Sequence, residues 1–181
     1  KNDVWLRATR GDPEVEWPID DDTMVRKLSV PSQGRMYYIR YAMKLGWSLK
    51  RIHDLTSIDP WFLDQFLQLV EFEDELLQIG ALEEVTAELM QKAKQFGYSD
   101  PQLAYLYCGV ISTETILAVR KHRKSLGVEP VYKLVDTCAA EFEAITPYYY
   151  STYERPLVQL GAGEVLDDEI RVSDSPKVVI L

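Results

Sequence analysis

V-D-T-C-A-A-E-F-E-A-I-T-P-Y-Y-Y-S-T-Y-E, residues 135–154, is the least generic stretch of this sequence. A short helical piece around Ala139 and Phe142 is predicted to end at Thr146, because Pro147 disfavours a helix at the residue before it. Four tyrosines then fall within six residues: Tyr148, Tyr149, Tyr150 and Tyr153. A short irregular segment cannot by itself bury four tyrosine rings. Each ring needs an apolar surface to pack against, and each hydroxyl needs a hydrogen-bond partner. Two interpretations stand: an aromatic loop closing this chain's own core, or a docking strip whose bed lies partly on another domain.

The totals describe a polar-surfaced globular chain of 181 residues, which suits one domain or one domain with tails. Hydrophobic residues make up 46% and charged residues 27%, enough for a core and a wet surface. The net charge of −9 argues against a general nucleic-acid or anionic-membrane partner, although it leaves room for a local basic face.

The ends and the cysteines bear on location. No apolar run approaches the ~20 residues that span a bilayer. The beginning, K-N-D-V-W-L, has neither a starting Met nor the apolar centre of a signal peptide, so a cut boundary is expected there. Two cysteines, Cys108 and Cys138, make no disulfide framework. We expect a reducing, cytoplasmic location.

Capping residues divide the chain into helices. Carboxylates at residues 20–22 predict a short helix over 23–28, and Ser32 is a candidate cap for a helix over 33–45. Further expected starts are Ser48, Asp59 with Pro60 at the first position, Ser99 or Asp100, and Ser112; a helix over 83–96 stops at Gly97. The helix after Asp59 has apolar residues on almost all of its faces and is predicted to be central and buried. Its solvent-exposed end is predicted to carry Glu71, Glu73, Asp74 and Glu75.

An internal repeat joins these helices. A-M-K-L-G-W-S-L-K-R-I-H-D-L, residues 42–55, aligns with A-K-Q-F-G-Y-S-D-P-Q-L-A-Y-L, residues 93–106, and the two glycines lie 51 positions apart. In each copy a glycine turns the chain, an aromatic staples the corner and a serine caps the next helix. The predicted fold is all-α: a compact multi-helix bundle of seven or eight helices, with two similar helix-turn-helix-like units, an extended segment at 131–135 and an extended C-terminal tail.

The 135–154 stretch resembles a signature of the carbamoyl-phosphate synthase large chain, at the end of its helical oligomerisation domain. L-T-S-I-D-P-W-F-L-D-Q, residues 55–65, and the final K-V-V-I-L, residues 177–181, are also similar to that family. The resemblance implies residues 1–30 as an irregular N-terminal segment, 31–154 as the oligomerisation domain, and 155–181 as a linker and the start of the following synthetase half.

The same resemblance implies a non-catalytic scaffold within an ATP-dependent ligase. The family makes carbamoyl phosphate for arginine and pyrimidine synthesis from bicarbonate, ATP and glutamine-derived ammonia. Its ATP, Mg or Mn, and K sites lie outside this segment, so no catalytic, metal or cofactor residue is carried over. The implied partners are the two synthetase halves, other large chains and the glutaminase small chain. The expected docking residues are Asp136, Thr137, Glu141, Tyr148, Tyr149, Tyr150, Tyr153 and Glu154.

A helix-turn-helix-like DNA-binding domain is the alternative. It rests on the repeat and on the basic run Arg120 to Lys124, which is what a major-groove helix presents. Cations near a helix C-terminus are also favoured by the helix dipole, and the acidic total weighs for that explanation.

Other chemistry is weakly indicated. His53, His122, Cys108 and Cys138 lack the close spacing of a zinc site. A third option is a hydrolase with Cys138 as nucleophile, but no sequence neighbour supplies a base, and a small core thiol is the preferred interpretation. Glu141 and Glu143 would point apart on a helix, which argues against paired acids, and no phosphate-binding glycine motif is present.

Overall fold

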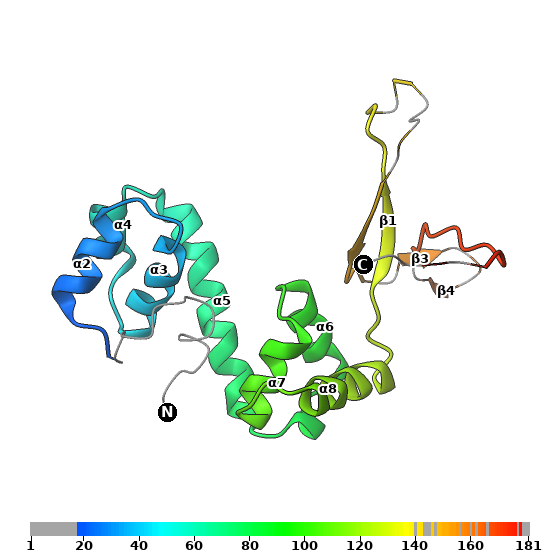
Figure 1. The fold of residues 1–181 in the computed structure, drawn as a ribbon, viewed down its shortest axis with the longest axis horizontal. Coiled ribbons are helices and arrows are strands. Elements are labelled where there is room, and N and C mark those ends of the chain that lie inside the picture. The colour runs from blue at the N-terminus through cyan, green and yellow to red at the C-terminus, as the bar shows by residue number, and fades with distance from the viewer. Residues whose placement is uncertain are drawn as a thin grey trace. The chain divides into compact units, whose positions relative to one another are not determined.

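The computed structural model describes residues 18–139, 141–142, 146, 148–155, 157–159, 161, 163–165, 167–176 and 178. These residues divide between two compact units (Figure 1). The first holds the chain up to Gly80 together with Tyr105–Gly109, and the second holds Ala81–Ala104 and the chain from Val110 onward.

Helices dominate the described residues, which confirms the predicted fold class. The helices are α2 (Asp21–Ser29), α3 (Arg35–Lys44), α4 (Leu49–Thr56), α5 (Pro60–Ile79), the 3₁₀ turn η1 (Leu82–Glu84), α6 (Ala87–Gln95), α7 (Asp100–Cys108) and α8 (Thr113–Ser125). The strands are β1 (Val131–Val135), β2 (Tyr148–Thr152), β3 (Leu157–Gln159) and β4 (Gly163–Val165). They form two antiparallel hairpins, β1–β2 and β3–β4.

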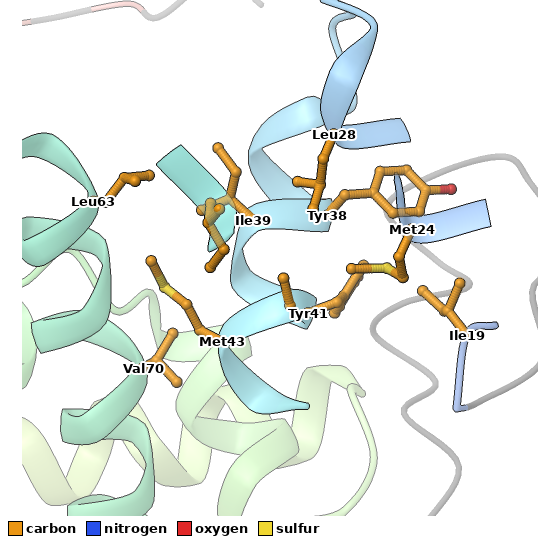
Figure 2. Close-up of a cluster of buried hydrophobic side chains, with 11 residues drawn as sticks. Ile19, Met24, Leu28, Tyr38, Ile39, Tyr41, Met43, Leu63 and Val70 are labelled. Atoms are coloured by element: carbon orange, nitrogen blue, oxygen red, sulfur yellow. The ribbon is translucent and has the colours of Figure 1, made fainter. Parts of the chain in front are cut away.

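The core of the first unit lies where α2, α3 and α4 meet α5. Figure 2 shows Leu63 and Val70 of α5 pointing toward α3, where Ile39 and Met43 lie. Met24 and Leu28 of α2 are completely buried in the same cluster. Burying a large aliphatic side chain contributes about 1.5–3 kcal/mol, so this cluster is the main source of stability for the unit.

The long helix α5 departs from the sequence prediction of a helix buried all round. Leu63, Val70, Phe72 and Leu76 are its buried residues. Trp61 and Phe62, at its beginning, are 62% and 55% exposed, and their rings meet edge to face with centroids 5.0 Å apart. Only one stripe of a helix can face a single core, so Phe66 and Leu67 are partly buried against it and Leu77 stays exposed.

At its predicted solvent-exposed end, Glu71, Asp74 and Glu75 are exposed, whereas Glu73 is partly buried. The Arg40 guanidinium donates to both carboxylate oxygens of Glu73, at 2.8 and 2.7 Å, and Lys44 donates to the same carboxylate. Burial alone would raise the pKa of Glu73, but Arg40 and Lys44 outweigh it and hold that pKa below its usual value. Glu73 therefore ties α5 to α3.

Most of the predicted caps are present. Ser48, Asp59 and Ser112 accept the expected backbone N–H bonds, and Pro60 occupies the first turn of α5. At α7 the cap is Ser99, whose hydroxyl accepts from the Gln102 amide while the Gln102 side chain accepts from the Ser99 amide, a reciprocal capping box.

Two predicted helix starts are wrong. Gly34 rather than Ser32 precedes α3, with no side-chain cap. The helix expected over 83–96 is broken, because Thr86 caps α6 by accepting from the Leu89 amide at 3.3 Å and leaves η1 as a separate turn. A threonine hydroxyl that satisfies a free amide at the third position restarts the helix there.

The internal repeat is confirmed in backbone hydrogen bonds. Trp47 N–H donates to Ala42 O at 2.9 Å, and its repeat counterpart, the Tyr98 amide, donates to Ala93 O at 3.0 Å. The two glycine amides also correspond: the Gly46 amide donates to Met43 O, and the Gly97 amide donates to Lys94 O. Both glycines have positive φ, +79° and +85°, as this Schellman corner requires.

The aromatic stretch differs most from its prediction. Tyr148–Thr152 is a strand and not an irregular segment, because it pairs with the extended segment predicted at 131–135. The expected helical piece is absent from the described residues between the strands: Thr137 to Ala139 form a turn, Ala139 has φ +51°, and Glu141 and Phe142 lie in a bend. Ala140, residues 143–145 and Pro147 lie outside the described residues.

Candidate docking site

The predicted docking residues lie on and around the β1–β2 hairpin. In its register Lys133 faces Tyr150, Leu134 faces Tyr149 and Val135 faces Tyr148. Side chains alternate along a strand, so Tyr148 and Tyr150 share one face and Tyr149 lies on the other. Their exposed fractions are 57%, 48% and 43%. The hairpin therefore presents exposed tyrosines on both of its faces.

Tyr153 differs from these three tyrosines, because its ring packs against side chains of α6 and α8. The Lys94 ammonium lies 5.1 Å from the centre of the Tyr153 ring, and the Arg123 guanidinium lies 5.5 Å from it. Cations over an aromatic face attract its quadrupole by about 0.5–2 kcal/mol. Burial raises the pKa of the Tyr153 hydroxyl, and the Asp100 charge contributes to the rise against the two arginines, Arg123 and Arg120. One end of the aromatic strip thus packs on helices of its own chain.

A buried carboxylate organises those cations. Asp100 accepts from Lys94 at 2.9 Å and from an Arg123 Nη at 3.4 Å. Burial would raise the pKa of Asp100, but these two cations outweigh it and lower that pKa from its usual value. Lys94, Asp100 and Arg123 come from α6, α7 and α8 in turn, so a single network joins the three helices beneath Tyr153.

Main-chain contacts fix the residues that follow β2. The Gln91 amide nitrogen donates to the carbonyls of Tyr153 and Glu154, at 3.1 and 3.0 Å. The Glu154 carboxylate lies 3.5 Å from the Lys133 ammonium. Glu154 therefore contacts the hairpin itself.

The loop residues expected to dock are exposed. Asp136 accepts from the Cys138 amide at 2.9 Å, an Asx turn, and the Glu141 amide donates to Cys138 O at 3.0 Å. Asp136, Thr137 and Glu141 are all solvent-accessible. The Asp136 carboxylate therefore caps a turn.

The sequence reasoning missed Lys133 and its acidic partners. The Lys133 ammonium donates to Asp167 and lies 3.7 Å from the Glu169 carboxylate. The hydrogen bond to Asp167 raises the pKa of Lys133, burial opposes the rise, and the charges of Asp167, Glu154 and Glu169 add to it. The available signal was D-D-E at 167–169, three acids in a stretch read as linker.

Most residues of the basic run on α8 make contacts within the second unit. Arg123 is buried and donates to Val128 O at 2.6 Å, and Arg120 lies 3.7 Å from Asp100. His122 Nε2 is 3.1 Å from Val85 O, and Lys124 pairs with Glu129 at 3.4 Å. These contacts give the basic run a structural role.

Other kinds of site are not indicated in the part of the chain that the structure describes. Within it, no group of three His, Cys, Asp or Glu side chains is placed to hold a metal ion. Cys108 is exposed and Cys138 half-buried. No single helix there is long and apolar enough to cross a bilayer; α7 and α8 reach that composition only together, across a bend of 105°.

These features define the class: a helical domain of duplicated corner units that presents an aromatic hairpin. A family model described as the oligomerisation domain of the carbamoyl-phosphate synthetase large chain matches residues 6–127. This chain belongs to that family. The comparisons therefore confirm the resemblance noted in the sequence, and nothing in them supports the DNA-binding alternative.

Curated relatives agree with this assignment. The chain is 50% identical over 147 residues to the carbamoyl phosphate synthase large chain of Rhodopirellula baltica, covering 79% of this chain. It is 54% identical over 150 residues to that of Archaeoglobus fulgidus, covering 76%, and 46% identical over 175 residues to that of a Nostoc species, covering 97%. The chain spans only 13% to 14% of the length of these relatives.

Proposed function

We propose that this segment is the scaffold of a carbamoyl-phosphate synthase large chain and that its β1–β2 hairpin docks on the two synthetase halves. The supporting observation is that exposed tyrosines lie on both faces of one paired strand. A single partner surface would cover only Tyr149 or only the pair Tyr148 and Tyr150. A hairpin gripped between two surfaces covers all three.

The anchoring of Tyr153 supports the same proposal. Its contacts with Lys94 and Arg123 hold the base of the hairpin on α6 and α8. A hairpin that is already held at one end loses less conformational entropy when it docks, so less of the binding free energy is spent on ordering it. Asp136, Thr137 and Glu141, exposed at the opposite end of the hairpin, then meet the partner surface, and Tyr153 and Glu154 set its base.

Chain-to-chain contact is assigned to the helical faces. Trp61 and Phe62 are the strongest candidates, since both are more than half exposed and aromatic residues are enriched at interfaces. In this proposal other large chains meet the first unit, and the synthetase halves of the same chain meet the hairpin.

The parent activity belongs to the proposal as well. The parent would be a cytoplasmic, ATP-dependent ligase acting in arginine and pyrimidine synthesis, with a glutaminase small chain as partner. ATP, Mg or Mn, and K would bind in the synthetase halves. The proposed division is residues 1–30 as the N-terminal segment, 31–154 as the oligomerisation domain and 155–181 leading to the next half.

Amide exchange in the complete large chain tests the docking. Residues 136–142 should exchange at least about tenfold more slowly in the complete chain than in this 181-residue segment, because partner surfaces cover the hairpin there. Replacing Tyr148, Tyr149 and Tyr150 by serine should remove that difference, whereas Tyr37→Ser, an exposed tyrosine of α3, should keep it. Equal exchange in the segment and in the complete chain would contradict docking.

A further inference from the structure

The outer edge of β1 is covered by a segment that follows the second hairpin. The Glu169 amide donates to Tyr132 O at 2.9 Å, the geometry of a neighbouring strand. Two further bonds come from side chains: Asp168 accepts from the Tyr132 amide at 3.2 Å, and Glu169 accepts from the Leu134 amide at 2.7 Å. Asp168 also accepts from the Ile170 amide at 3.0 Å, which shapes the segment itself.

These contacts fit the alternation of an antiparallel strand. Tyr132 and Leu134 turn their peptide groups away from β2, so the groups of Val131, Lys133 and Val135 face it. The segment Asp167–Ile170 thus satisfies the groups that would otherwise leave β1 as an open edge. Open edges pair with other extended chains, and proteins usually cover them.

Lys133 is the charge that holds the cover. Its side chain is 10% exposed, and its ammonium lies beside Asp167, Glu169 and Glu154. Three carboxylates lie close together here and would repel one another without a cation. Lys133 is therefore needed to hold the segment on β1. On this edge, the carboxylates of Asp168 and Glu169 accept the amide hydrogen bonds that backbone carbonyls would accept in a regular β-strand.

We propose that Asp167–Ile170 is a separable acidic clasp that covers the outer edge of β1, with Lys133 as its electrostatic anchor. The clasp goes beyond the proposed docking function, since it concerns the edge of the hairpin and not its tyrosine faces. Opening it would leave two N–H groups and one C=O on β1 without these hydrogen bonds.

Residue-resolved amide exchange of the protein tests the clasp. The double variant Asp168→Ala with Glu169→Ala removes both side-chain acceptors and leaves Lys133 with Asp167 and Glu154. The Tyr132 and Leu134 amides should then exchange at least about tenfold faster, while Val131, Lys133 and Val135 stay protected by β2. Asp174→Ala, an exposed acid of the same tail, should change none of the five.

Two results would overturn the clasp. Tyr132 and Leu134 amides that already exchange freely in the unmodified protein would show an open edge. Loss of protection at all five β1 amides in the double variant would show that the segment is part of the hairpin fold and not separable from it.

Lys133→Met tests the anchor. This variant keeps the apolar stem but removes the charge, so it should speed exchange at the same two amides and leave the β2-facing amides protected. Unchanged exchange at Tyr132 and Leu134 would rule out Lys133 as the anchor.

Discussion

The ammonium nitrogen of Lys94 lies 5.1 Å from the centre of the Tyr153 ring, so the last tyrosine of the aromatic stretch rests on α6 of its own chain. The three tyrosines before it are exposed. The two interpretations of this stretch therefore apply to different residues: Tyr153 packs on helices of its own chain, while Tyr148 to Tyr150 remain available for the proposed docking.

Removing the Tyr153 ring should destabilise the second unit. Tyr153→Ala is expected to lower its free energy of unfolding by about 1–3 kcal/mol, since both the cation–π contacts and apolar burial are lost. Tyr153→Phe, which keeps the ring, should retain most of that stability. Denaturation followed by amide exchange measures the change, with Tyr148→Ala as the exposed control at about 0.5 kcal/mol or less. A similar loss for Tyr148→Ala would count against this distinction.

The carboxylate beneath Tyr153 is expected to matter more. Asp100→Asn keeps the shape of the side chain but leaves the buried Arg123 and Lys94 without an opposite charge. Breaking a buried pair by removing one partner costs about 3–5 kcal/mol. Urea unfolding of the variant measures it, and Asp54→Asn, an exposed partner of Lys50 on α4, should cost about 1 kcal/mol or less. Equal costs for the two variants would contradict a buried network.

Glu73 should make the first unit acid-sensitive. The folded-state pKa of Glu73 lies below its usual 4.5. The unfolded chain therefore takes up the proton first as pH falls, so the stabilisation is complete above pH 4.5 and is lost as pH drops through the lower folded value. In Glu73→Gln, stability measured between about pH 3 and 6 should fall less steeply. Parallel pH curves for the variant and the parent would refute a paired Glu73.

The repeated glycine corners should respond alike to substitution. Gly46→Ala and Gly97→Ala each force a Cβ into positive φ, at a cost of about 1–2 kcal/mol. An added Cβ would meet nothing within 4 Å at either position, so backbone strain alone sets the cost. Gly34→Ala, with φ −83° and equally open space, is the control and should change stability by about 0.5 kcal/mol or less. Thermal unfolding measures these changes. Equal changes in stability for all three variants would contradict backbone strain at the two corners.

The helical class, most helix starts and the duplicated corner could be predicted from residue order alone. Those features depend on neighbours: Ser48, Asp59 and Ser112 bond amides within three residues, and Gly46 and Gly97 set the turn by their own φ. A capping or turn signal of this kind is complete within one helical turn, so the order of residues is enough to specify it.

The partners of the aromatic stretch and of the acids, in contrast, depend on how the whole chain folds. Pairing with β1 made a strand of Tyr148–Thr152, although the local sequence suggested an irregular segment. Lys133 meets Asp167, and Tyr153 meets Lys94, across separations that no local pattern encodes. Such contacts form only after the intervening chain has folded, because packing brings the groups together and removes the water that would otherwise weaken their attraction.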